Sequence, residues 1–329
     1  MYWYIKYPLL AILLVAFLGI FGSAMRSCVR GKSTDGGDGD KTPQTENVEP
    51  VAPVSDNTTP PAEALAKPPA PAASAAVEER LAMAQKQLDQ GMLEMARELA
   101  RKVLESPEAV EFGPTWEAAV HIIDDADKRL MNSSAPASEK RGHRVSKGEN
   151  LERIARRYYT NQLALKRINE NLRRDGGDPI IRPSQTIMYI TGTWSIRVSK
   201  QHFKLLLYLD GKLYRCWTIG IGRDNRTPAG TFLITDAIAK PAWTPPGKSI
   251  PYGDPENVLG TRWLKLTPTE GTDPTLEGYG IHGTWEPETV GTSCSAGCVR
   301  MRNDDVEELF DFIPPPGGSA PPVRVVIEE

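Results

Sequence analysis

Two side chains with the chemistry for acyl transfer lie close together near the end of the chain. His282 and Cys298 are among only four histidines and four cysteines in 329 residues, and both fall in the segment IHGTWEPETVGTSCSAGCVRM, residues 281–301. A cysteine becomes a strong nucleophile only as its thiolate, and an imidazole within hydrogen-bond reach can take the proton and hold it as an ion pair. The minimal hypothesis is Cys298 as nucleophile with His282 as base.

The residues beside the cysteine suggest how a developing oxyanion would be held. The backbone N–H groups of Gly297 and Cys298, with Ala296 next to them, could form a nest around it, because glycine permits a close approach. Arg300 would either pin this loop or meet a substrate carboxylate, which a guanidinium fork suits. Ser295 is expected to hydrogen-bond within the loop.

Two other uses of these side chains compete with catalysis. Cys294, Cys298 and His282 could be metal ligands, but three ligands at this spacing lack a fourth and form no finger pattern. A Cys294–Cys298 disulfide could form in an oxidising compartment and would disable the nucleophile. Cys216 lies on an expected strand and is expected in the core. The sequence therefore predicts no metal and no cofactor.

The elements that carry this segment are expected to be strands. From Thr193 onward apolar and polar residues alternate, and Asp210-Gly211 is typical of a two-residue hairpin turn. Short strands continue to the closing PVRVVIEE, so residues 193–329 predict a mainly-β domain, a sandwich or a partly open barrel. The Pro/Gly-rich stretch 240–262 is either a lid over the cleft or a plain surface loop.

The ordered motifs TPAGTF, HGTWEPETVG and SAGCVRM resemble the L,D-transpeptidase catalytic domain family over residues 194–328. One departure is Ala296, a position where that family often has histidine. The resemblance implies that the Gly283 carbonyl orients His282. It also implies that Cys298 attacks the third residue of a tetrapeptide stem, typically meso-diaminopimelate, and expels D-alanine.

The acceptor would decide what the resulting thioester becomes. An amine of a second stem would give a 3→3 cross-link, and an amine of a protein would anchor that protein to the wall. Water would make the site an L,D-carboxypeptidase. A non-catalytic peptidoglycan-binding tether is the alternative from another class of function, and the intact motif argues against it.

Residues 141–191 resemble a lysin motif (LysM) module, a small βααβ unit. The turn KGENL and the segment IRPSQT match that pattern with mild departures. The resemblance implies binding of N-acetylglucosamine-containing glycans in a groove formed by Gly148, Glu149, Asn150, Leu151 and Arg182. Between residues 141 and 174 ten Lys or Arg stand against three Glu, a balance that favours an anionic polymer.

The first 135 residues divide into three parts. Residues 1–25 include an apolar run flanked by aromatic residues, which predicts a membrane anchor or a signal peptide. Residues 26–75 are Pro- and Ala-rich and predict a disordered linker. Residues 76–135 have apolar residues at three- and four-residue steps, which predicts an all-α helical hairpin of tetratricopeptide type. This hairpin is either a spacer that packs on a neighbour or a peptide-binding unit.

Together these parts predict a multidomain protein of the bacterial cell envelope. The formal net charge of −3 argues against wholesale nucleic-acid binding. The expected partners are peptidoglycan stems and glycan strands, and the membrane through the N-terminal segment. The catalytic domain would then lie outside the cytoplasmic membrane, with a role in cell wall biogenesis and cell shape.

Overall fold

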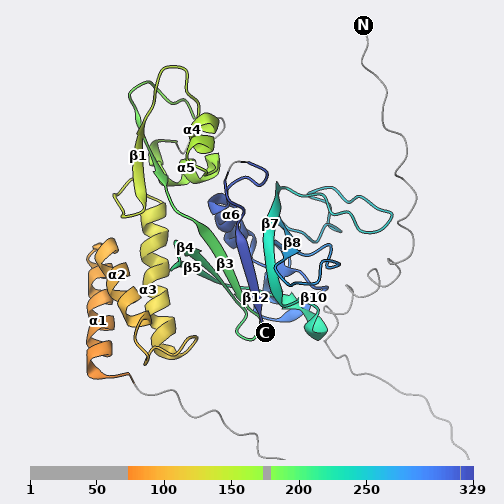
Figure 1. Ribbon diagram of the computed structural model, residues 1–329, viewed down its shortest axis with the longest axis horizontal. Helices are drawn as coiled ribbons and strands as arrows, with labels where there is room; N and C mark the ends of the chain where they lie inside the picture. Colours follow the sequence, from red (N-terminus) through yellow and green to blue (C-terminus); the bar gives the residue numbers. More distant parts are fainter. Residues whose placement is uncertain (1–72, 173–178, 319) are drawn as a thin grey trace, which may run out of the picture.

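A computed structural model describes residues 73–172, 179–318 and 320–329 of the chain (Figure 1). The predicted membrane segment at residues 1–25 lies outside the described residues, as does nearly all of the predicted linker at 26–75. Among the helices in the described ranges, none is long and apolar enough to cross a bilayer. The described residues form a helical unit, a LysM unit and a mainly-β unit, so the predicted kinds of structure are present.

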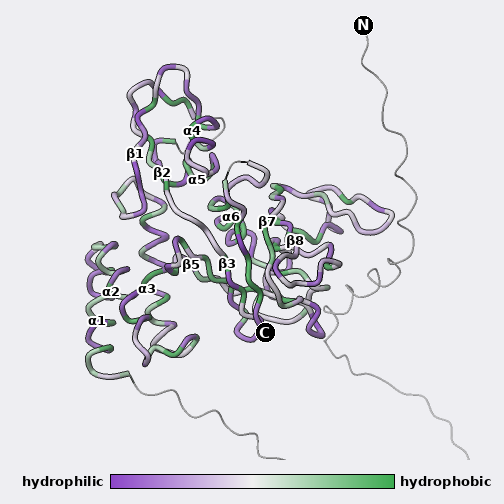
Figure 2. The backbone as a smooth tube through the Cα atoms, viewed as in Figure 1, coloured by the Kyte–Doolittle hydropathy of each residue, from purple (hydrophilic) through white to green (hydrophobic). Residues whose placement is uncertain are grey.

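The helical unit contains three helices where the sequence predicted a hairpin. They are α1 (Ala75–Asp89), α2 (Leu93–Leu104) and α3 (Pro114–Met131). Proline at the first position of α3 suits a helix start, because its missing N–H has no partner there anyway. Small residues such as Ala84, Ala96 and Ala100 are fully buried where the helices meet. Figure 2 shows the resulting alternation of hydrophilic and hydrophobic stretches along these helices.

Helix α3 joins the helical unit to the mainly-β unit. Trp116 and Val120 of α3 form a buried cluster with Leu206 and Leu213, which belong to the hairpin strands β4 (Lys204–Leu209) and β5 (Lys212–Thr218). Arg215 of β5 adds an ion pair with Asp124 of α3. The helical unit therefore packs on a neighbour, as the spacer interpretation expected.

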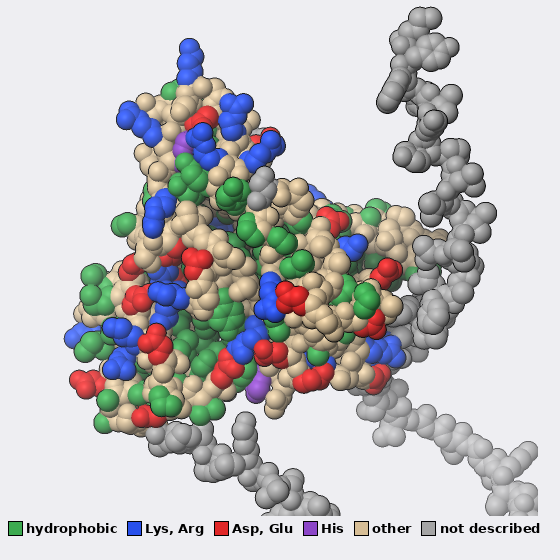
Figure 3. Space-filling view, in the orientation of Figure 1, with side chains coloured by type: hydrophobic (Ala, Val, Ile, Leu, Met, Phe, Trp, Pro, Cys, Tyr) green, Lys and Arg blue, Asp and Glu red, His purple; other side chains and the backbone are tan. Residues whose placement is uncertain are grey.

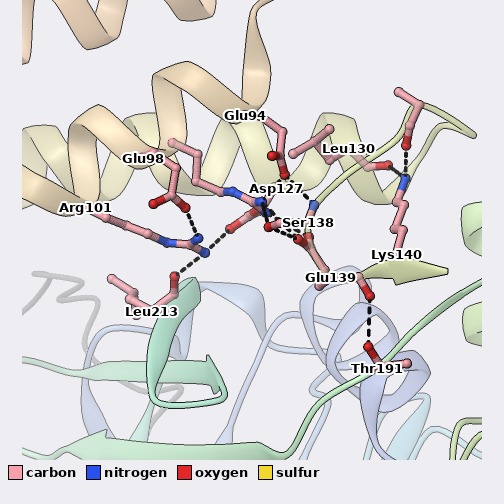
Figure 4. A network of polar contacts seen from close by, with 12 residues as sticks. Glu94, Glu98, Arg101, Asp127, Leu130, Ser138, Glu139, Lys140, Thr191 and Leu213 are labelled. Carbon is pink, nitrogen blue, oxygen red and sulfur yellow. Dashed lines mark hydrogen bonds and ion pairs between the residues drawn. The ribbon is translucent and has the colours of Figure 1, made fainter.

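A buried polar network connects the helical unit to the LysM unit (Figure 4). Arg97 is fully buried, and its guanidinium bonds Asp127 at 2.5 Å, Glu139 at 2.8 Å and Glu94 at 2.5 Å. Burial raises the pKa of Asp127 to about 7, although Arg97 and Arg101 oppose that shift. A charge removed from water in this way is tolerable only while its partners stay in place.

Lys140 closes the end of α3 beside this network. Its ammonium donates to the carbonyls of Leu130, Ser133 and Ala135 at 2.6, 2.8 and 2.9 Å. The last carbonyls of a helix have no partner within the helix, and a cation there also suits the helix dipole. Because Lys140 is the first residue of the LysM unit, this contact fixes where that unit leaves the helix.

The LysM unit has the predicted βααβ order. Strands β1 (Lys140–Arg144) and β2 (Thr186–Ile190) pair antiparallel, and between them lie α4 (Leu151–Arg157), α5 (Gln162–Ile168) and the 3-10 turn η1 (Glu170–Leu172). Figure 3 shows this unit standing out from the body of the molecule with Lys and Arg side chains spread over it.

One eight-stranded sheet forms the mainly-β unit, in the order β11-β9-β8-β7-β12-β3-β4-β5. Besides β4 and β5 the strands of this unit are β3 (Trp194–Ser199), β6 (Ile221–Gly222), β7 (Gly230–Ala239), β8 (Arg262–Thr269), β9 (Gly280–His282), β10 (Ser293–Ser295), β11 (Val299–Arg300) and β12 (Arg324–Glu328). Asp210 and Gly211 form the β4–β5 turn with φ of 50° and 76°, as a two-residue hairpin requires. The closing segment of the chain is β12, a central strand parallel to β3 and antiparallel to β7.

The two ends of this sheet meet. Gly220, just after β5, and Arg300 of β11 exchange two backbone hydrogen bonds of 2.8 Å. Strands β6 and β10 form a small parallel pair beside them. The sheet therefore curls into a partly open barrel, with the 3-10 turns η2 (Arg223–Asn225) and η3 (Pro287–Thr289) at this end.

Helix α6 (Asn303–Phe312) packs against the sheet and holds the LysM unit in place. Val306, Leu309 and Phe312 of α6 are buried in the main core. On its other side, the Asn161 amide donates to the carbonyls of Phe310 and Ile313, each at 3.0 Å. Arg167 of α5 also pairs with Asp311 at 2.5 Å. The LysM unit thus has a defined position on the mainly-β unit.

We predict that Arg97→Met lowers the free energy of unfolding by about 3–5 kcal/mol near pH 8, because it leaves the Asp127 carboxylate buried and short of partners. Urea unfolding followed by far-UV circular dichroism measures this loss. The folded-state pKa of Asp127 is raised, so its contribution to stability falls as pH rises through about 7. The loss should accordingly be smaller near pH 5.

Arg129→Met is the matched control, because this arginine is 43% exposed and pairs with Asp125 at 3.6 Å. The free energy of unfolding of Arg129→Met should fall by less than about 1 kcal/mol. Equal losses for the two variants would show that the buried network does not hold the helical unit.

Candidate active site

The parallel pairing of β9 with β11 brings His282 and Cys298 to one place. Val299 lies opposite Ile281, and Arg300 lies opposite His282. Ile281 and Val299 are buried in the core, and side chains alternate along a strand, so His282, Cys298 and Arg300 belong to the other face of the sheet. The segment between the two residues is therefore a crossing that returns the cysteine beside the histidine.

The His282 ring is held by its backbone surroundings. Its Nδ1 lies 2.6 Å from the Gly283 carbonyl oxygen, and the Leu259 backbone near the ring also favours the protonated imidazole. A Cβ on Gly283 would lie 2.2 Å from Asn303 Oδ1, and one on Gly260 would lie 2.3 Å from the same atom. At Gly260 a Cβ would also lie 2.5 Å from the Gly283 backbone carbon, so this position requires glycine and holds the Gly283 carbonyl closely in place.

Trp263 of β8 covers the floor of the site, and the sequence analysis missed it. It pairs with His282 across the strands, and the two rings lie 5.7 Å apart with 29° between their planes. A Cβ on Gly280 would meet the Trp263 ring at 2.5 Å. The alternation in WLKL places Trp263 and the buried Leu264 on opposite faces, and this was the signal that could have found it.

Burial leaves both reacting groups neutral in the resting enzyme. It lowers the pKa of His282 to about 4, with Arg300 adding to the effect and the Gly283 carbonyl opposing it. It raises the pKa of the Cys298 thiol to about 11, although Gly280 and Arg300 oppose the shift and the residue keeps some exposure to solvent. Both shifts favour the neutral thiol and the neutral imidazole over the expected thiolate–imidazolium ion pair.

The hydrogen bonds of the thiol agree with a neutral resting pair. Cys298 Sγ donates weakly to the Gly278 carbonyl at 3.6 Å. Within the described residues, no hydrogen bond joins this thiol to His282. Catalytic hydrogen bonds are often long or poorly aligned before substrate binds, so this geometry is compatible with His282 as a base.

Ser295 ties together the loop that carries the cysteine. Its hydroxyl donates to the Cys298 carbonyl at 2.7 Å and accepts the Gly297 N–H at 3.1 Å. The Gly297 carbonyl in turn accepts from the Thr227 hydroxyl at 2.8 Å. The Gly297 N–H expected in the oxyanion nest is thus already engaged, and Ala296 lies in the same tight loop.

Arg300 pins a neighbouring loop in the resting enzyme. It is 5% exposed, and its guanidinium contacts Glu286 at 3.2 Å and the Thr289 hydroxyl at 3.4 Å. Its position beside His282 also accounts for its effect on the imidazole pKa. Arg300 was expected to pin the cysteine loop or to meet a substrate carboxylate, whereas its side-chain contacts here are with Glu286 and Thr289.

The Pro/Gly-rich insertion has internal order. Asn257 is buried, and its amide donates to the carbonyls of Pro241, Ile250 and Pro251 at 3.0–3.2 Å. At its rim the Tyr252 ring lies 6.1 Å from Trp285, which is 48% exposed. Near the end of the loop, the Leu259 backbone lies close enough to His282 to influence its pKa. The insertion therefore borders the site and contributes aromatic surface to it.

In the LysM unit, several side chains expected to contact a glycan hold their own turn instead. Glu149 accepts from the Ser146 N–H at 2.7 Å and lies 2.9 Å from His143, and these two contacts hold its pKa below the ordinary value. Asn150 caps α4 by accepting from the Arg153 N–H at 2.8 Å. Leu151 is in the core. Glu149 and Asn150 are engaged because a short turn must satisfy its own polar groups first, and Leu151 is engaged by apolar packing.

The remaining LysM candidates lie where a ligand could reach them. Gly148 has φ of 81°, a conformation that favours glycine, and nothing lies within 4 Å of a Cβ built there. The Arg182 N–H donates to Gln185 Oε1 at 3.0 Å, and its side chain is exposed. His143 was missed by the sequence analysis. It joins Glu149 to the Tyr158 hydroxyl, 2.9 Å from its Nδ1, and so stiffens this turn.

Comparisons with known proteins match both modules. Residues 193–327 match the L,D-transpeptidase catalytic domain model, and residues 143–187 match the LysM domain model. The chain is 40% identical over 118 residues to "Putative L,D-transpeptidase YqjB" of Bacillus subtilis, covering 36% of this chain and 64% of that protein. It is 33% identical over 182 residues to "Putative L,D-transpeptidase YkuD" of Bacillus licheniformis, covering 52% of this chain and 93% of that protein.

A solved L,D-transpeptidase from Mycobacterium smegmatis is 15% identical, covering 58% of this chain and 91% of that one with a TM-score of 0.33, and it adds nothing to the sequence matches. The chain matches nearly the whole length of the Bacillus licheniformis relative. This match and the catalytic domain model place the chain in a class of enzymes, the acyltransferases that act through a cysteine. The chain belongs to the L,D-transpeptidase family and carries a LysM domain before its catalytic domain.

We predict that iodoacetamide modifies Cys298 at a rate that rises roughly tenfold per pH unit between about pH 7 and 9, since only the thiolate reacts. The rate rises with pH because the pKa of the thiol is raised, so the thiolate fraction is still growing throughout that window. Peptide mapping by mass spectrometry separates Cys298 from the other cysteines.

His282→Gln tests whether the imidazole ionises the Cys298 thiol before substrate binds. In a neutral resting pair, this substitution should change the modification rate by less than about threefold, because the imidazole does not ionise the thiol at rest. A plateau from about pH 5 to 8 that disappears in His282→Gln would instead establish a resting ion pair.

Proposed function

We propose that this protein is a peptidoglycan L,D-transpeptidase in which Cys298 is the nucleophile and His282 the general base. The observation that carries the proposal is the β9–β11 register, which sets the cysteine beside a histidine whose ring is oriented by the Gly283 carbonyl. The family membership of the chain supports the same reaction.

The pKa shifts of the two residues support one order of proton transfers. His282, neutral at physiological pH, accepts the thiol proton as Cys298 Sγ attacks the carbonyl of the third stem residue. The protonated imidazole then donates to the departing amine of D-alanine, leaving a thioester on Cys298. The two steps balance, because the proton removed from sulfur is the one given to the leaving group.

The oxyanion of the first intermediate would be stabilised at the Cys298 loop. The Cys298 N–H is the first candidate donor, and the Gly297 N–H becomes available when the intermediate displaces its bond to Ser295. Arg300 lies behind this loop and adds positive potential near the developing charge. Its bond to Glu286 keeps it in place during the reaction.

An amine of a second stem is the acceptor that we favour, giving a 3→3 cross-link, with a protein amine as the variant that anchors proteins. The exposed Trp285 and its neighbour Tyr252 rim the insertion beside the site and offer surface for a second stem. Water as acceptor would give the carboxypeptidase product from the same thioester.

The LysM unit would hold the enzyme on glycan strands, through its exposed turn at Gly148 and through Arg182. Its excess of Lys and Arg suits an anionic wall polymer. The apolar segment at residues 1–25 is proposed as a membrane anchor that leaves residues after about 25 on the outer side, where peptidoglycan lies. This arrangement places the protein in the cell envelope.

We predict that incubation with a disaccharide-tetrapeptide donor gives a Cys298 thioester with loss of D-alanine, followed by a 3→3 dimer. Intact-mass spectrometry under reducing conditions detects the adduct, and chromatography of the products identifies the acceptor. Cys298→Ala should abolish both, and His282→Ala should slow acylation by at least about a hundredfold.

Cys294→Ala is the matched control, because Cys294 is a free, partly exposed thiol in β10, four residues before Cys298. It should acylate at the rate of the unmodified enzyme. If the unmodified protein gave no adduct and no product but still bound sacculi, the proposed enzymatic function would be wrong. The non-catalytic tether would then be the better interpretation.

A further inference from the structure

Tyr159 occupies a backbone position that favours glycine. It follows the end of α4, where the Thr160 N–H bonds the Ala155 carbonyl at 3.0 Å and the Tyr159 N–H bonds the Arg156 carbonyl at 3.4 Å. These two bonds define a Schellman helix end, whose central residue is left-handed and usually glycine. Tyr159 takes this conformation with φ of 54°. A bulky residue there strains the backbone.

Packing does not compensate for this strain, in contrast to two other aromatic residues. Phe112 has φ of 61°, and its ring stacks on His202 at a centroid distance of 4.0 Å. Phe203 has φ of 53° and packs against the main core. Tyr159 is 54% exposed, and among the described residues its ring has no aromatic partner. The fold thus keeps a strained aromatic ring facing solvent.

The Tyr159 ring lines a cavity between the LysM unit and the mainly-β unit. The cavity has a volume of about 560 Å³, within the usual range for ligand sites. Its lining is mixed, with the charged groups of Glu152, Arg156 and Asp236 around apolar surface from Ile313 and Pro315. The Asn161 bonds to Phe310 and Ile313 hold its two walls together.

This cavity is separate from the catalytic site. Its lining comes from α4, α5 and the connection between them, from Asp236 and Ala237 of β7, and from the end of α6 with the segment after it. The residues that form the candidate active site, His282, Gly283, Cys298, Arg300 and Trp263, are not among the residues that line the cavity. The cavity is therefore not the place where Cys298 would meet the reacting carbonyl.

We propose that this cavity is a saccharide subsite in which a sugar ring of the glycan strand stacks on Tyr159. A sugar offers an apolar C–H face to an aromatic ring and hydroxyl groups to carboxylates and guanidinium groups, and the lining supplies both. Strained backbone positions cluster at ligand-binding sites, so the strained and exposed Tyr159 ring is a reasonable contact for a ligand. The occupied subsite would fix the strand across the junction of the two units. The identity of the polymer rests on the proposed function.

The test compares Tyr159→Gly with Tyr159→Phe in the full chain. Glycine relieves the left-handed position, so its Tm should stay equal or rise by up to about 4 °C. Its affinity for glycan strands freed of stem peptides, measured by isothermal titration calorimetry, should fall by about fivefold or more. Phenylalanine keeps the ring and should retain the affinity within about twofold.

Acylation of Cys298 by a sugar-free tetrapeptide separates this inference from the proposed function. It should be unchanged in Tyr159→Gly, since the subsite binds sugar only. Unchanged glycan affinity in Tyr159→Gly would overturn the subsite while leaving the enzyme intact. If Tyr159→Gly lost acylation by the peptide but kept its affinity for glycan, the saccharide subsite would also be wrong. The cavity would then be a site for peptide.

Discussion

The parallel pairing of β9 with β11 is the constraint on which the site depends. One register places Val299 and Ile281 in the core, and the same register aligns Arg300 with His282 on the opposite face. A slip of one residue would turn every side chain to the wrong face. The bonds between Gly220 and Arg300 fix this register by closing the curled sheet, and so the barrel and the site form together.

The other units are attached to this barrel by contacts of different kinds. The helical unit uses an apolar surface at Trp116 and a buried network around Arg97. The LysM unit uses amide and ion-pair contacts with α6, chiefly through Asn161 and Arg167. Such directional contacts specify orientation as well as affinity. A glycan held by the LysM unit would then approach the mainly-β unit from a fixed direction.

Local patterns predicted much of this organisation. The order of modules and the Asp210-Gly211 turn depend on short motifs, so one sequence was enough to predict them. The His282–Cys298 pair was also read from a short motif, and its catalytic role stays a prediction. The central place of β12, the inward turn of Glu149 and the neutral resting pair depend on residues far away in the sequence. Burial by the whole fold, which no local motif encodes, sets the pKa values of the pair. The strain at Tyr159 likewise appears only when its backbone angle is known.

The structure of the acyl-enzyme, formed with a tetrapeptide donor and no amine acceptor, tests the central claim most directly. The account predicts the donor carbonyl carbon on Cys298 Sγ, its oxygen at roughly 2.7–3.1 Å from the Cys298 N–H, and the His282 ring facing the thioester. An adduct on Cys294, or a thioester whose oxygen points away from the loop and whose sulfur lies out of reach of His282, would contradict it.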